Sequence, residues 1–212
     1  MQPLTPISPK KKRAALPDLE LQRDRAVSIG PSRKGPSVTE VIPGFLFLGG
    51  VTDGTNQETL ERIGVQYVLC VAKECDGPAD VSTLVYKKIS MIDKSRESLR
   101  ANFTEAFNFL EEARAKGVRI LVYCRMGASR SASLVIAYCM TYRSMTFPEA
   151  LLYVQSKRTV VDPNVGFVSE LEAYDEDLSK IRSPLNASPL MTEDELRSIL
   201  KPSFNSPNAA KQ

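Results

Sequence analysis

The sequence contains no histidine among its 212 residues. Without histidine the chain can form neither a Ser-His-Asp triad nor a Cys-His pair, and it offers no histidine ligand to zinc. Any chemistry must therefore be carried out by Cys, Asp, Glu, Lys, Arg, Ser or Tyr side chains. We expect a protein that works without a metal or another cofactor.

The chain also lacks long apolar segments and paired cysteine motifs. No apolar run approaches the length of a membrane span, and the first twenty residues are too polar for a signal peptide. Its four cysteines (Cys70, Cys75, Cys124 and Cys139) form neither a paired metal motif nor a framework of secreted disulfides. These absences predict a soluble, monomeric protein of a reducing compartment that binds neither membranes nor nucleic acid.

The composition fits one globular domain with two polar tails. Hydrophobic residues make up 42% of the chain and charged residues 25%. Residues 1–37 carry eight basic and three acidic residues together with six prolines, so we expect a disordered basic tail. Residues 38–181 are expected to form the domain. Residues 182–212 are expected to form a flexible tail with one short helix at residues 192–200.

Two motifs lie in the basic tail. The run PKKKR at residues 9–13 resembles a nuclear import signal, which favours a cytoplasmic protein that also enters the nucleus. The basic cluster that begins at Lys10 is followed by Leu16, Leu19 and Leu21, so residues 10–21 resemble a docking peptide for a protein kinase. For each motif a solvated run of charge is an equal alternative.

Hydrophobic patterns predict strands that alternate with helices. Strands are expected at residues 41–48 (two short strands separated at Pro43 and Gly44), 65–71, 84–89 and 118–123. Helices are expected at residues 56–63, 102–116, 131–142, 146–156 and 167–178, with a loop between residues 49 and 55. This order predicts a single α/β domain with a central, mostly parallel sheet flanked by helices.

The strongest functional signal is the segment LVYCRMGASRSAS at residues 121–133. An apolar strand leads into a tight loop in which Cys124 and Arg130 stand six positions apart, with Gly127 between them. Such a loop can direct successive backbone N–H groups inward, and the helix that follows adds the positive end of its dipole. The segment therefore predicts a binding loop for a phosphate dianion.

This segment resembles the active-site signature of the dual-specificity branch of the cysteine-based protein phosphatases. The resemblance extends over residues 38–178, including LFLG at residues 46–49 and the later Pro163-Asn164-x-x-Phe167. Slingshot-type and atypical dual-specificity members are the most similar. The resemblance implies a signalling hydrolase that acts on phosphoserine, phosphothreonine and phosphotyrosine in proteins.

The resemblance also implies a role for each site residue. Cys124, as a thiolate, would attack phosphorus and form a phosphocysteine intermediate, while Arg130 would hold two phosphate oxygens. Asp93, in the polar loop after the strand that ends at residue 89, would protonate the leaving oxygen and later activate water. Glu97 is the substitute for this acid. Ser129 is expected to offer its hydroxyl to the sulfur, although a simple helix cap is an alternative.

The remaining positions of the loop shape its mouth and leave two alternatives open. Arg125, Met126, Gly127 and Ala128 complete the expected phosphate-binding loop. Tyr123 occupies the position before the nucleophile, where this family usually has histidine, and its hydroxyl supplies no positive charge near neutral pH. Activity could therefore be modest, with a higher pH optimum, or the chain could be a pseudophosphatase that binds phosphoproteins without turnover. A phosphatase of phosphoinositides or RNA ends is disfavoured because the loop lacks several lysines.

Cys70 ends a strand that is expected to lie beside the strand of Cys124. Under oxidation these two thiols could form a protective disulfide. We favour the interpretation of Cys70 as a buried bystander, as for Cys75 and Cys139.

Overall fold

The computed structural model describes residues 37–182. The predicted basic tail, the import signal, the kinase-docking peptide and the helix at residues 192–200 lie outside the described residues. Between residues 37 and 182, no helix is both long enough and apolar enough to cross a membrane.

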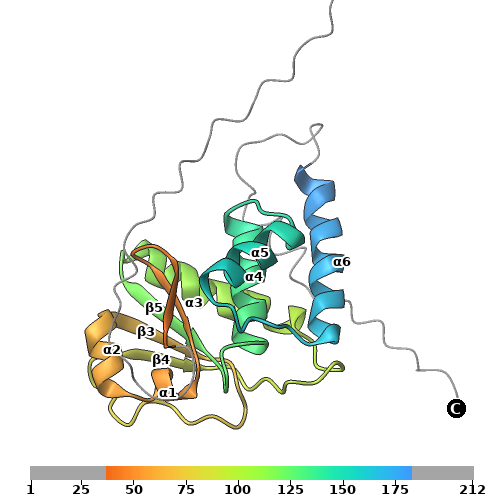
Figure 1. Cartoon of the computed structure of the whole chain (residues 1–212). Helices are drawn as coiled ribbons and strands as arrows, with labels where there is room; N and C mark the ends of the chain where they lie inside the picture. The colour runs from red at the N-terminus through yellow and green to blue at the C-terminus, as the bar shows by residue number, and fades with distance from the viewer. Residues whose placement is uncertain (1–36, 183–212) are drawn as a thin grey trace, which may run out of the picture. The chain divides into compact units, whose positions relative to one another are not determined.

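A five-stranded sheet forms the centre of the domain (Figure 1). Its spatial order is β1-β2-β5-β3-β4, and only the pair at the β1 edge is antiparallel, because all other neighbours run parallel. This confirms the α/β fold with a mostly parallel sheet. The strands are β1 (Thr39–Ile42), β2 (Leu46–Gly49), β3 (Val65–Cys70), β4 (Val85–Lys88) and β5 (Arg119–Tyr123).

Six α-helices accompany the sheet within residues 37–182, and five of them occur where the hydrophobic patterns place them. The exception is α1, which occupies part of the segment that we expected to be a loop. With four residues it is too short to show a helical period, and the Asp53 carboxylate supports its start by accepting the Gly50 N–H at 2.9 Å. The helices are α1 (Val51–Gly54), α2 (Gln57–Ile63), α3 (Phe103–Ala115), α4 (Arg130–Tyr142), α5 (Phe147–Lys157) and α6 (Val165–Arg182).

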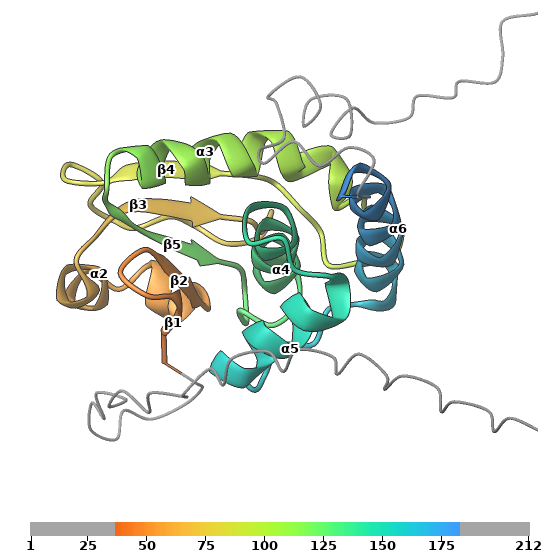
Figure 2. The ribbon, with the colours of Figure 1, turned by 90° about the horizontal axis from the view of Figure 1, so that it is seen from above.

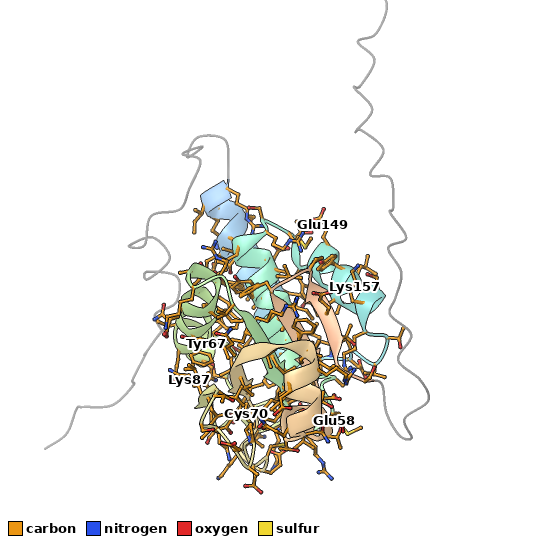
Figure 3. All side chains as sticks on the ribbon, turned by 90° about the vertical axis from the view of Figure 1, so that its left-hand side faces the viewer. Glu58, Tyr67, Cys70, Lys87, Glu149 and Lys157 are labelled. Atoms are coloured by element: carbon orange, nitrogen blue, oxygen red, sulfur yellow. The ribbon has the colours of Figure 1, made fainter. Side chains whose placement is uncertain are left out.

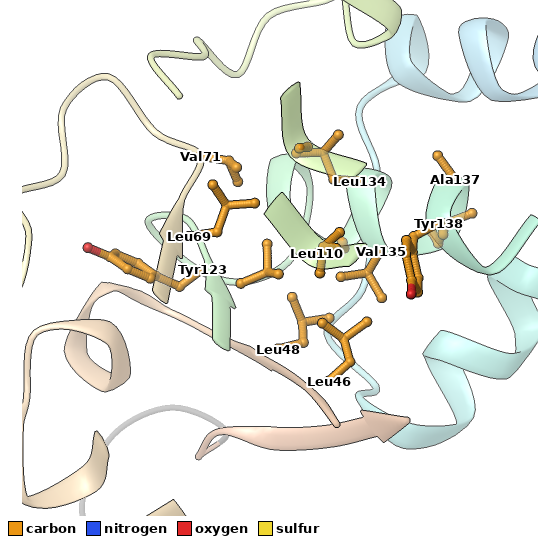
Figure 4. Packing of buried hydrophobic residues seen from close by; sticks show 14 of the residues in the cluster. Leu46, Leu48, Leu69, Val71, Leu110, Tyr123, Leu134, Val135, Ala137 and Tyr138 are labelled. Atoms are coloured by element: carbon orange, nitrogen blue, oxygen red, sulfur yellow. The ribbon is translucent and has the colours of Figure 1, made fainter. Parts of the chain in front are cut away.

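Helix α4 is the central helix of the domain. All of its residues from Arg130 to Met140 are buried, and α3, α5 and α6 surround it (Figure 2). On the sheet side, Leu46 and Leu48 of β2 pack towards Leu110 of α3 and Val135 of α4 (Figure 4). Burial on all sides fixes the position of the α4 N-terminus next to the end of β5. The predicted phosphate loop therefore lies at the carboxyl ends of the parallel strands, where α/β folds commonly bind ligands.

The opposite side of β5 is covered by α1. A Cβ atom added to Gly54 would lie 2.4 Å from Cδ1 of Tyr123, so the helix can approach the tyrosine ring only because this residue is glycine. Tyr123 is fully buried, and Figure 4 shows its side chain pointing away from the leucines of the core.

This contact predicts that Gly54→Ala destabilises the domain. The added methyl group forces the Tyr123 ring or α1 to move, which should lower the free energy of unfolding by about 1–3 kcal/mol in urea denaturation. Thr52→Ala, an exposed position of the same helix, is the matched control and should change it by less than about 0.5 kcal/mol. Equal stability of the two variants would show that the contact is not tight.

Candidate active site

The loop between β5 and α4 encloses the sulfur of Cys124. This side chain is 1% exposed, and its Sγ accepts hydrogen bonds from the backbone N–H of Gly127 at 3.2 Å and from the hydroxyl of Ser131 at 3.1 Å. Both donors are therefore placed to bond a sulfur that carries negative charge. The N-terminus of α4 adds the positive end of its dipole.

The loop is held from its outer side by Arg158. This buried side chain donates from Nε to the carbonyl oxygen of Gly127 at 2.9 Å and from Nη2 to that of Met126 at 3.1 Å. The N–H of Asp162 donates to the carbonyl oxygen of Ala128 at 2.9 Å. Three consecutive carbonyls therefore have partners outside the loop. The sequence analysis did not foresee this structural role of Arg158.

Arg130, at the start of α4, is paired with a carboxylate that the sequence analysis missed. Its Nη1 and Nη2 donate to the two oxygens of Glu74, each at 2.7 Å, and Nη1 also donates to the carbonyl oxygen of Met91 at 3.2 Å. Nε is buried and has no hydrogen-bond partner among residues 37–182, although Oδ2 of Asp93 lies 3.5 Å away. Glu74 thus fixes one edge of the guanidinium and leaves the Nε/Nη2 edge available for two phosphate oxygens.

The ion pair between these residues is charged at any ordinary pH. The hydrogen bonds from Arg130 hold the pKa of the Glu74 carboxyl at about 2. Burial alone would lower the pKa of Arg130, but the bond to Glu74 and the charges around it raise the pKa above its usual value. The orientation of the guanidinium should therefore not change with pH in the neutral range.

Asp93 lies beside this ion pair, in the loop that follows β4. Its Oδ1 accepts hydrogen bonds from the hydroxyl of Ser129 and from Nδ2 of Asn164, both at 2.7 Å. The backbone N–H of Asn164 in turn donates to the Ser129 hydroxyl at 3.1 Å. Asp93 lines the pocket above Cys124, whereas the alternative acid, Glu97, is not among its lining residues.

The expectation for Ser129 was wrong. Its hydroxyl bonds neither to the sulfur nor to the backbone as a helix cap, but to Asp93. Ser131 contacts the sulfur instead, because a side chain in the first turn of a helix points back towards the N-terminus, where Cys124 lies. The spacing alone did not distinguish the two serines.

The phosphate loop, Glu74, Ile92 and Asp93 together line one pocket of about 400 Å³. It contains every predicted site residue except Gly127, whose backbone makes the turn beneath it. A neighbouring pocket of about 510 Å³ shares Glu74 and Arg125, which form the wall between the two. The lining residues of the first pocket are Glu74, Ile92, Asp93, Cys124, Arg125, Met126, Ala128, Ser129 and Arg130.

The other cysteines take no part in this pocket. Cys70, labelled in Figure 3, is fully buried at the end of β3 and pairs in register with Tyr123, and its thiol lies 3.7 Å from the carbonyl oxygen of Ala72. All four cysteines are free and buried. Burial raises the pKa of Cys75 and of Cys139 to about 11, so neither thiol is prepared for nucleophilic attack.

A comparison with protein-family models identifies the family to which a domain with this pocket belongs. The model described as "Dual specificity phosphatase, catalytic domain" matches residues 46–177, which include the whole pocket. The chain belongs to the dual specificity phosphatase family. It is a protein phosphatase of dual specificity, and its substrates are phosphoproteins.

Individual relatives agree with this assignment. Dual specificity protein phosphatase 1 of Arabidopsis thaliana is 34% identical over 154 residues, which cover 73% of this chain and 77% of that protein. Protein phosphatase Slingshot homolog 3 of Rattus norvegicus is 35% identical over 74% of this chain, but the match covers only 22% of that longer protein. The crystal structure of human DUSP28 superimposes with a TM-score of 0.64 at 33% identity and covers 70% of this chain and 99% of that one.

The phosphatase loop gives a prediction at Gly127. This residue has a φ of +68°, and an added Cβ would lie 2.4 Å from the carbonyl oxygen of Gly49. Gly127→Ala should therefore displace the loop and lower kcat/KM at least about 100-fold, the usual cost of misplacing a catalytic group by about 1 Å.

Gly117→Ala is the matched control for this variant. Gly117 has a φ of +67°, but an added Cβ would have nothing within 4 Å. The Gly117→Ala variant has the same backbone strain without the clash. Its free energy of unfolding should therefore fall by about 1 kcal/mol, while its activity should be unchanged. Full activity of Gly127→Ala would show that the loop does not need this close approach.

Proposed function

We propose that the domain hydrolyses phosphoserine, phosphothreonine and phosphotyrosine through a phosphocysteine intermediate on Cys124. The observation that carries this proposal is the convergence of three groups in one pocket. They are a sulfur with two hydrogen-bond donors, the guanidinium of Arg130 with a buried Nε that makes no hydrogen bond among residues 37–182, and the carboxyl group of Asp93. They correspond to the nucleophile, the phosphate-binding group and the proton donor that such a reaction requires.

In the first step the sulfur anion of Cys124 attacks phosphorus. The S–P bond forms while the bond from phosphorus to the serine, threonine or tyrosine oxygen breaks. Asp93 gives its proton to that leaving oxygen. Arg130 holds two non-bridging oxygens of the phosphoryl group, and the inward N–H groups of the loop share the charge that develops on it.

In the second step water replaces the sulfur. Asp93, now a carboxylate, removes a proton from the water molecule as its oxygen attacks phosphorus, and the S–P bond breaks. The thiolate leaves with the electron pair and is stabilised by the Ser131 hydroxyl and the Gly127 N–H. Inorganic phosphate is released.

The form of the pocket supports dual specificity. Exposed lining side chains of this pocket include Ile92, Arg125 and Met126, and the neighbouring pocket gives room for substrate residues beside the phosphorylated one. Arg125 lies between the two pockets and should favour targets with acidic groups near the phosphate. A pseudophosphatase is the less favoured alternative, because nucleophile, cation and acid are all present.

The test of the proposal uses a chromogenic aryl phosphate and a phosphoserine peptide with purified protein. Cys124→Ser should abolish turnover of both, because a serine hydroxyl is not ionised in this loop. Asp93→Asn should slow the phosphoserine peptide far more than the aryl phosphate, since an alkoxide leaves poorly without a proton. Wild-type protein that binds phosphopeptide without turning it over would establish the pseudophosphatase instead.

The two serines of the loop should differ in the step that they affect. Ser131→Ala removes the hydroxyl bonded to Sγ and should slow breakdown of the phosphocysteine intermediate by about 10- to 100-fold, so that a burst of the aryl product precedes a slow steady state. Ser129→Ala loosens Asp93 and should slow the leaving-group step without a burst. Rapid-quench kinetics distinguish the two, and a burst with Ser129→Ala would reverse the assignment.

A further inference from the structure

The residue before the nucleophile, Tyr123, contacts a part of the site other than the sulfur. Its hydroxyl donates to the carbonyl oxygen of Asp76 at 2.8 Å, and its ring lies against Gly54 of α1. Asp76 belongs to the segment after β3 that also carries Glu74, the partner of Arg130. Only Cys75 separates Asp76, whose carbonyl is anchored, from Glu74, whose carboxylate orients the guanidinium.

We propose that Tyr123 is a positioning residue for Arg130. It fixes the segment of residues 74–77, hereafter the clamp loop, and through the Glu74 carboxylate it holds the Nε/Nη2 edge of the guanidinium towards the incoming phosphate. The inference refines the proposed function, because it concerns the phosphate-binding group of the same pocket.

Besides the burial of Cys75, two further hydrogen bonds attach the backbone of the clamp loop. Its Cys75 N–H reaches the carbonyl oxygen of Ala72 at 3.4 Å, and Lys88 Nζ donates to the Cys75 carbonyl oxygen at 2.7 Å. The side chain of Glu74 is 44% exposed, so packing alone does not immobilise it. Tyr123 and Lys88 therefore hold the two successive carbonyls that follow Glu74, and removal of either should let the carboxylate shift.

The properties of Tyr123 suit it for this contact. Its side chain leaves β5 on the face opposite to the core leucines, and the long phenol places its hydroxyl at the clamp loop (Figure 4). Burial raises the pKa of the Tyr123 hydroxyl above its ordinary value, so it remains a neutral donor throughout the working range of pH. The Tyr123 hydroxyl therefore does not titrate in this range and should add no step to the pH profile of kcat/KM.

The test measures binding of inorganic phosphate by calorimetry and KM for a chromogenic aryl phosphate. Tyr123→Phe keeps the ring against Gly54 and removes only the hydrogen bond. The dissociation constant of phosphate and KM should both rise about three- to tenfold, the effect of one hydrogen bond. The pH dependence of kcat/KM should keep its shape, because the donors to the Cys124 sulfur are untouched.

Tyr67→Phe is the matched control. Tyr67 is a buried tyrosine of β3 whose hydroxyl donates to Oε1 of Glu112 at 2.8 Å, and neither residue belongs to the clamp loop or lines the pocket. Removal of this hydroxyl should leave phosphate binding unchanged. If Tyr123→Phe does not fold, Lys88→Met, which frees the neighbouring carbonyl of the clamp loop, should weaken phosphate binding in the same way.

Combination with Glu74→Gln tests whether the effect passes through the carboxylate. If it does, the double variant Tyr123→Phe/Glu74→Gln should bind phosphate no more weakly than Glu74→Gln alone. Unchanged phosphate binding by Tyr123→Phe, or effects of the two substitutions that multiply, would overturn the inference. Because phosphate binding needs no turnover, an inactive wild-type protein would refute the proposed function while the titration still decides this inference. A wild-type protein that does not bind phosphate contradicts both.

Discussion

The site depends on a guanidinium that is almost completely removed from water. The Arg130 side chain is 4% exposed, and such a cation is tolerated only when counter-charges and hydrogen-bond acceptors surround it. The acceptors come from two segments that are far apart in sequence, Glu74 after β3 and the stretch from Met91 to Asp93 after β4. Arg130 thus determines where both segments contact the phosphate loop. The rest of the pocket depends on this contact.

The same constraint brings the acid to its position before substrate arrives. Without phosphate, Asp93 supplies part of the negative charge around Arg130 while Ser129 and Asn164 hold its other oxygen. An arriving phosphate dianion would take the place of that charge at the Nε/Nη2 edge. Asp93 therefore already lies beside the position of the phosphoryl group, where our proposal needs a proton donor.

The sequence was sufficient for most of the fold because strand and helix periods and cap residues are local signals. The α1 helix was not predicted, because a helix of four residues is too short to show a hydrophobic period. The phosphate loop could be predicted from Cys124, Gly127 and Arg130, whereas the assignment of Asp93 as the acid came from the family resemblance. Glu74 was not readable, since nothing local marks a carboxylate whose partner lies 56 positions away. The roles of the two loop serines also needed coordinates, because the direction of a side chain at a loop-helix junction depends on backbone angles that spacing does not reveal.

The alternation of side chains along β5 explains how a substitution next to the nucleophile can act at a distance from it. Successive residues of a strand point to opposite faces, and at its end Tyr123 turns towards the clamp loop while Cys124 turns into the phosphate loop. The donors to the sulfur come from Gly127 and Ser131, so they do not depend on the identity of residue 123. What residue 123 can change is the position of the clamp loop. In our proposal, a tyrosine in place of histidine therefore bears on how the protein holds phosphate.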